Sequence, residues 1–162
     1  MIALKTILVA TDFSEPSEAA LAYGRELART FNASLTVFHA VANIAIYGGD
    51  VPLFEPDAQR DLEASSQQQL DALLSDEDRT VLHATTALRT AFSPAAAIVD
   101  HAREVKADLI VIGTHGRGAV AHLLLGSVAE RVVRTAPCPV LTVRHPEREF
   151  VLPDALVAIG QA

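Results

Sequence analysis

A glycine-rich stretch in the second half of the chain carries the residues best suited to bind an anion. It follows the aliphatic run Leu109–Ile112 and has the spacing Gly113-x2-Gly116-x9-Gly126-Ser127. Glycine lets the main chain approach a bulky anion because no Cβ stands in the way. A helix that begins near Ser127 points its unpaired N–H groups and its positive end back at the same loop. The spacing therefore predicts an anion site, most naturally for phosphate.

Two better-known phosphate motifs do not account for this spacing. A Walker A loop requires Gly-Lys-Ser/Thr, and no such tripeptide follows these glycines. The dinucleotide motif GxGxxG has a different glycine spacing, and here the glycines stand late in the chain. One or two glycines after a strand can also serve the geometry of the turn alone. Turn geometry is therefore the alternative to nucleotide binding.

Other residues of this stretch could add contacts to a phosphate group. Arg117 would supply positive charge to an otherwise acidic protein, or it is a solvated surface arginine. Together with Gly116 and Gly118 it is expected to wrap the phosphates. Ser127 could cap the following helix, and its hydroxyl could also donate to a phosphate oxygen.

The rest of the chain reads as strands that alternate with helices. The predicted strands are Lys5–Thr11, Ser34–Val41, Thr80–Leu88, Asp108–Gly113 and Val140–Arg144. The predicted helices are Pro16–Phe31, Asp57–Leu74, one opened by Ser93 and Pro94 with Ile98, Ala102 and Val105 as its buried stripe, and Ser127–Thr135. This alternation predicts an α/β protein with a parallel sheet and right-handed crossovers. The connection from Asn43 to Pro56 is unusually long for such a unit, which suggests a lid or a partner surface.

Ligands of parallel sheets bind beyond the carboxyl ends of the strands, where the strand order reverses. The first predicted strand ends at Asp12, and the fourth ends at Gly113. If these strands are neighbours, the two residues face the same space. Asp12 is then a candidate ligand contact or phosphoacceptor, and a helix cap shared with Ser14 is the alternative.

Composition narrows the classes of protein to consider. The 162 residues suffice for one domain, expected at 1–145, with a C-terminal tail at 146–162. The net charge of −7 would repel DNA and RNA, so nucleic-acid binding is not expected. No signal peptide and no membrane-spanning run is evident, so a cytoplasmic protein without a membrane partner is expected.

Cysteine and histidine offer little chemistry here. The lone Cys138 excludes an internal disulfide and is expected to be a buried small hydrophobe. His115 and His122 flank the glycine-rich loop, but further ligands at metal-binding spacing are not evident. We therefore expect no metal held by side chains alone.

The motif resembles the ATP-binding motif of the universal stress protein family, G-2x-G-9x-G-(S/T), at every defined position. The resemblance extends over residues 4–145 and includes the opening Ile7–Ser14, the stretch His39–Val41 and the closing Ala136–Val143. It implies a single-domain doubly wound sheet of five mainly parallel strands in the order 3-2-1-4-5, with helices on both faces, similar to a Rossmann fold. It also implies a homodimer formed through the strand around Val140–Val143.

The family further implies an ATP site, with Mg²⁺ expected beside the nucleotide. By resemblance, Asp12 approaches the adenosine, Val41 flanks the adenine, and Thr114 and Val128 lie near the ribose and the phosphates. A plain core valine is the alternative for Val41. The full expected set is Ala10, Thr11, Asp12, Val41, Gly113, Thr114, Gly116, Arg117, Gly118, Gly126, Ser127 and Val128.

Three functions remain open at this point. The leading one is an ATP-binding regulatory protein of the stress response, acting on a protein partner that the sequence does not identify. The second is a slow ATPase or nucleotide hydrolase, which is weakened because the loop lacks a lysine to brace the β and γ phosphates. The third is a dimeric interaction protein that works without nucleotide. A response-regulator receiver is disfavoured, because the third strand ends near Leu88–Thr90 without a phosphoacceptor aspartate.

Overall fold

A computed structural model describes residues 1–44, 46–48, 51–53, 56–114 and 125–144. The strands are β1 (Thr6–Ala10), β2 (Ser34–Ala42), β3 (Ile46–Gly48), β4 (Val51–Leu53), β5 (Thr85–Ala91), β6 (Leu109–Gly113) and β7 (Val140–Val143). The helices are α1 (Glu15–Phe31), α2 (Pro56–Ala72), α3 (Asp76–Val81), α4 (Pro94–Glu104) and α5 (Ser127–Thr135). The predicted helix at Ser127–Thr135 is confirmed at both ends.

The main sheet has five parallel strands in the order β5-β2-β1-β6-β7. This is the expected order 3-2-1-4-5, because the short β3 and β4 stand outside the sheet. The strands β1 and β6 are neighbours in register, with Ala10 beside Ile112. The ends of the first and fourth predicted strands therefore lie side by side, as the family resemblance implied.

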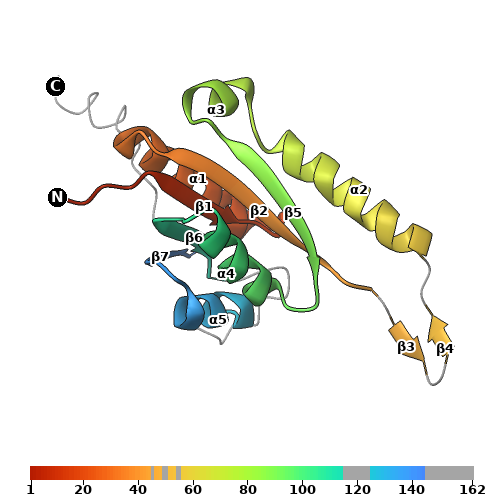
Figure 1. Ribbon diagram of the computed structural model, residues 1–162. Coiled ribbons are helices and arrows are strands. Elements are labelled where there is room, and N and C mark those ends of the chain that lie inside the picture. The colour runs from red at the N-terminus through yellow and green to blue at the C-terminus, as the bar shows by residue number, and fades with distance from the viewer. Residues whose placement is uncertain (45, 49–50, 54–55, 115–124, 145–162) are drawn as a thin grey trace.

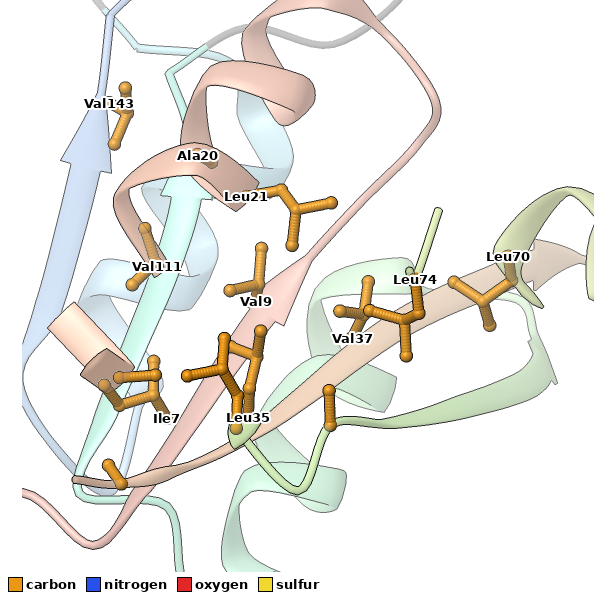
Figure 2. Packing of buried hydrophobic residues seen from close by; sticks show 14 residues of the cluster. Ile7, Val9, Ala20, Leu21, Leu35, Val37, Leu70, Leu74, Val111 and Val143 are labelled. Carbon is orange, nitrogen blue, oxygen red and sulfur yellow. The ribbon is translucent and has the colours of Figure 1, made fainter. Parts of the chain in front are cut away.

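Helices cover both faces of the sheet (Figure 1). On one face, α1 and α2 pack on Ile7, Val9, Leu35 and Val37, which are all fully buried. Figure 2 shows this core between the strands and the helices, with Leu21 of α1 close to Val9. On the other face, α4 and α5 pack on a second set of buried residues: Leu8, Ala10, Phe38, Ile110 and Ile112. Continuous aliphatic strands are what two covered faces require.

The strand predicted at Thr80–Leu88 is placed too early. Residues Asp76–Val81 form α3 instead, and β5 begins at Thr85. A capping box starts α3: the side chain of Ser75 accepts from the N–H of Asp78, and the Asp78 carboxylate accepts from the N–H of Ser75. These reciprocal bonds satisfy two donors at the helix start, so they favour the helix over a β-branched strand.

The long connection after β2 also differs from expectation. It was expected as an irregular loop at 43–56, but β3 and β4 pair as an antiparallel hairpin within it. In Figure 1 this hairpin extends from the end of β2 away from the sheet. The extra length is thus partly used for secondary structure of its own.

An ion pair between Arg25 of α1 and Asp78 of α3 connects these two helices. The guanidinium of Arg25 donates from Nε and Nη2 to the carboxylate of Asp78, with a shortest distance of 2.8 Å. Nη2 also donates to the carbonyl of Leu73 at 2.6 Å. The side chain of Asp78 is only 3% exposed, so this carboxylate depends on Arg25 for compensation of its charge.

The start of α4 and the place of Cys138 agree with the sequence. Ser93 is the N-cap of α4, and its hydroxyl accepts from the N–H of Ala96. Ile98 and Ala102 are buried as predicted. Cys138 is partly buried against the core under α4 and α5, and burial raises the pKa of its thiol. The protonated thiol therefore behaves as the small hydrophobe that was expected.

Candidate functional site

The structure brings most of the predicted site residues to one edge of the sheet. Ala10 ends β1 and is followed by Thr11 and Asp12. Gly113 ends β6 and is followed by Thr114, and α5 begins beside them after Gly126. Gly116, Arg117 and Gly118 lie outside the described residues.

The turn from β1 into α1 is built from short polar side chains. The hydroxyls of Thr11 and Ser17 lie 3.0 Å apart, and both residues are buried. The N–H of Phe13 donates to the Thr11 hydroxyl, which helps to hold Phe13 at the unusual positive φ of 63°. The Asp12 carboxylate accepts from both the N–H and the hydroxyl of Ser14. This network fixes the turn before any ligand is considered.

Capping of α1 was an alternative role for Asp12 and Ser14. Ser14 is the N-cap residue, but its side chain makes no capping hydrogen bond to the helix. Its hydroxyl is directed to Asp12 instead. Asp12 therefore braces the turn that precedes α1, and the half-buried carboxylate stays at the edge of the sheet.

His39 belongs to this turn, although no role in it was predicted from the sequence. Its Nδ1 lies 2.8 Å from the carbonyl oxygen of Thr11, and its ring lies 4.4 Å from the ring of Phe13. Because a carbonyl only accepts, Nδ1 must carry the proton and donate. The only sequence signal was its position near the end of β2, which the parallel register places beside the end of β1.

Gly113 is required by the packing of the fold. A Cβ at this position would lie 2.9 Å from the main-chain carbon and oxygen of Pro16 and 3.0 Å from its Cβ. Real Cβ atoms essentially never approach so closely, and Pro16 cannot swing aside because it sits in the first turn of α1. The first glycine of the motif thus lets the end of β6 touch the start of α1.

The start of α5 faces the end of β6. The N–H of Thr114 donates to Val143 of β7, and the Thr114 carbonyl accepts from the N–H of Gly126 at 2.6 Å. Gly126 is the N-cap of α5 and has no side chain with which to cap the helix, so the capping role expected for Ser127 is wrong. The exposed Ser127 is the first helical residue. The first N–H groups of α5 are therefore suited to an anion, as expected of an uncapped helix start.

The end of β2 has a direction that the sequence did not reveal. Val41 is only 1% exposed, and in a parallel ladder its main-chain groups face β5, since the N–H of Asn43 donates to Ala91 of that strand. Alternate residues face the other neighbour, and the carbonyl of Phe38 accepts from the N–H of Thr11 after β1. The main chain of Ala40 therefore faces the edge beyond β1. The role of Val41 stays a prediction, and Ala40 is a further candidate that the sequence did not single out.

Within the described residues, the structure offers neither a membrane span nor a ready metal centre. None of their helices combines the length and the apolarity that a bilayer crossing needs. No group of three or more His, Cys, Asp or Glu side chains among them is arranged to hold a metal ion.

Comparison with known proteins now decides the family. The model described as "Universal stress protein family" matches residues 3–144. The chain belongs to the universal stress protein family. A universal stress protein of Thermus aquaticus is 41% identical over 140 residues, which cover 86% of this chain and 98% of that protein. The family expected from the glycine motif is confirmed.

Solved structures of universal stress proteins share the fold. UspA of Lactobacillus plantarum superposes with a TM-score of 0.73 at 25% identity, covering 89% of this chain and 100% of that one. The Archaeoglobus fulgidus protein in complex with dAMP gives 0.60 at 26% identity, over 88% and 99% of the two chains. A universal stress protein in complex with cAMP gives 0.56 at 27% identity, over 88% and 98%.

Proposed function

We propose that this universal stress protein binds an adenine nucleotide, ATP with Mg²⁺, at the carboxyl edge of β2, β1 and β6. The observation that carries the proposal is the closure of the glycine motif by the hydrogen bond between Thr114 and Gly126. This bond sets the uncapped start of α5 beside the end of β6. Two relatives of similar fold are described in complex with dAMP and with cAMP, which share an adenine base and a phosphate.

The residues of this edge fit such a ligand. The N–H groups at Ser127 and Val128 begin an uncapped helix and suit phosphate oxygens. The main chain of Ala40 offers a donor and an acceptor to a base. Thr11 and Asp12 follow β1, which lies between β2 and β6 in the sheet, and so stand between the base and the phosphates. Backbone amides would let a chain of net charge −7 hold an anion. Arg117 and its flanking glycines would complete the phosphate contacts, and Mg²⁺ would be held chiefly by the phosphates.

Binding without efficient hydrolysis is the activity that the described residues support. Hydrolysis needs a group that orients water in line with the γ phosphate. The Asp12 carboxylate already accepts two hydrogen bonds from Ser14, which suits a structural role. We therefore propose that bound ATP shifts the association of the protein with a partner in the cytoplasmic stress response, and that two copies pair through β7.

Isothermal titration calorimetry with ATP and Mg²⁺ tests the proposal on the wild type and on Gly116→Val. The wild type is expected to bind, and a Cβ branch in the loop is expected to weaken binding at least about tenfold, because main-chain atoms can then no longer approach the phosphates. Circular dichroism establishes that the variant is folded. Equal affinity in the two proteins would remove the glycine loop from the account.

A further inference from the structure

The main-chain groups on one side of β2 continue past the end of β1. The register between these strands ends at the pair of Ala10 and Phe38. The carbonyl of Phe38 accepts from the N–H of Thr11 at 2.9 Å, so Phe38 faces β1. By the alternation of a parallel ladder, Ala40, Ala42 and Ile44 face the same side. These three residues lie beyond the end of β1, so β1 does not pair with their main-chain groups.

The far part of this side is occupied by a side chain. Gln59 of α2 is only 7% exposed. Its Oε1 accepts from the N–H of Ile44 at 3.0 Å, and its Nε2 donates to the carbonyl of Ala42 at 3.4 Å. One residue of an adjacent parallel strand would bridge a carbonyl and the N–H two residues later in the same way, through its own N–H and its own carbonyl. The amide of Gln59 thus takes the place of a missing strand.

The orientation of this amide is set by its own neighbours. Nε2 of Gln59 also donates to Oε1 of Glu63 at 3.1 Å, one turn further along α2. The same oxygen accepts from the hydroxyl of Thr90 on β5 at 2.6 Å. An ionised carboxylate only accepts, so the nitrogen of Gln59 must face Glu63 and the oxygen must face Ile44. The amide is therefore held from two sides, by α2 and by β5.

We propose that Gln59 is a positioning residue for the base of the bound nucleotide, an inference that rests on the proposed function. The N–H of Thr11 donates to the carbonyl of Phe38, and the amide of Gln59 is bonded to the carbonyl of Ala42 and the N–H of Ile44. The N–H and the carbonyl of Ala40 lie between these occupied groups. Gln59 thereby confines the base to the single residue Ala40 and holds the main chain on its far side in place.

If the base can bond only to Ala40, the order of donor and acceptor on that residue decides which base is bound. Ala40 offers its N–H and its carbonyl to the same side, which suits a base edge with one acceptor beside one donor. Adenine presents N1 as an acceptor beside the donating N6 amine, whereas guanine presents N1–H as a donor beside the accepting O6. Phosphates anchored at the start of α5 prevent the base from turning over to reverse this order. Gln59 therefore supports a preference for adenine over guanine.

The test measures the affinities of ATP, GTP and inorganic tripolyphosphate by calorimetry in the wild type, in Gln59→Met and in Gln69→Met. Methionine keeps the length of the side chain and removes its hydrogen bonds. Gln69 is an exposed residue of the same helix, bonded only to Ser65, so it is the matched control. If Gln59→Met does not fold, Glu63→Met replaces it, because the Gln59 amide then loses the carboxylate that fixes its orientation, and the same losses are expected in smaller measure.

Gln59→Met is expected to weaken ATP about tenfold, the contribution of roughly one well-placed hydrogen bond, and to leave tripolyphosphate unchanged. The preference for ATP over GTP should fall by a similar factor, while Gln69→Met behaves as the wild type. If Gln59→Met leaves the affinity for ATP unchanged, or weakens all three ligands equally, the role of Gln59 is overturned while the proposed function stands. Failure of the wild type to bind ATP would overturn the proposed function and this inference with it.

Discussion

The N–H of Gly126 and the carbonyl of Thr114 form a 2.6 Å hydrogen bond that joins the two ends of the glycine motif. Thr114 directly follows β6, and Gly126 directly precedes α5. The main chain on either side of residues 115–124 therefore meets at one point, beside the end of β1. This relationship makes the start of α5 part of the carboxyl edge, where ligands of parallel sheets bind.

Replacement of Gly113 by alanine is predicted to destabilise the fold. The new Cβ would press on the main chain of Pro16, so the start of α1 or the end of β6 must shift. We expect the free energy of unfolding in urea to fall by about 1–3 kcal/mol, the usual range for overpacking. An unfolding midpoint equal to that of the wild type would show that the contact between β6 and α1 is looser than described.

The bond between Arg25 and Asp78 is predicted to matter more than surface ion pairs. Arg25→Met leaves a carboxylate that is 3% exposed without its partner, and this is expected to cost about 3 kcal/mol in urea unfolding. The control is Arg60→Met, since Arg60 and Asp57 are 77% and 92% exposed. That variant should change stability by less than about 0.5 kcal/mol. Similar losses in both variants would contradict the buried character of the first pair.

His101 is predicted to make the fold sensitive to mild acid. Its ring stacks on Phe38 at 4.8 Å, and both ring nitrogens are buried without a hydrogen bond. Burial is the main cause that lowers the pKa of His101, helped by the charge of Arg89 and opposed by Glu104. The unfolded chain, with a histidine pKa of about 6.5, then binds more protons than the folded one. The contribution of neutral His101 to the free energy of unfolding is therefore fully present above about pH 6.5, and it is lost as the pH falls below that value.

The measurement for His101 is the urea midpoint between about pH 7.5 and about pH 5, a range that spans the ordinary histidine pKa. His101→Phe keeps an aromatic ring against Phe38 and cannot be protonated, so its midpoint should fall less than that of the wild type. His83→Gln, at an exposed position, serves as the control. Identical pH profiles for the wild type and His101→Phe would refute the prediction.

Pairing through β7 is predicted to depend on the outward N–H of Thr142. The carbonyls of Pro139 and Val143 accept bonds from β6 and from Thr114, so alternate residues of β7 face away from the sheet. Thr142→Pro removes one outward donor, and it should weaken self-association about tenfold in sedimentation equilibrium. Thr142→Val keeps the N–H and should associate as the wild type does. A monomeric wild type, or a dimer indifferent to the proline, would contradict pairing through this edge.

The buried strands could be predicted because aliphatic runs bounded by glycines are local signals, whereas the strand order was implied only by the family resemblance. The sequence Ser75-Asp-Glu-Asp78 carries a capping-box signature, so α3 in place of the start of the third strand also has a local signal. Other features arise only when distant residues meet. The contact of Gly113 with Pro16 and the bonds of Gln59 with Ala42 and Ile44 leave no local pattern. Tertiary packing decides them.

The direction of main-chain groups was likewise beyond prediction. Val41 and Ala40 are adjacent, yet only the register with β1 and β5 shows which of them faces the edge. A shift of one residue exchanges the two directions. A candidate base contact could therefore be located to the end of β2 from the sequence, but not to a single residue.

The most direct test of the account maps the main-chain amides by ¹⁵N NMR while ATP and Mg²⁺ are added to the wild-type protein. The largest shifts are expected at Thr11, Ala40 and Ser127, which lie at the ends of β1 and β2 and at the start of α5. Saturable binding that leaves these three amides unchanged, or no binding at all, would contradict it.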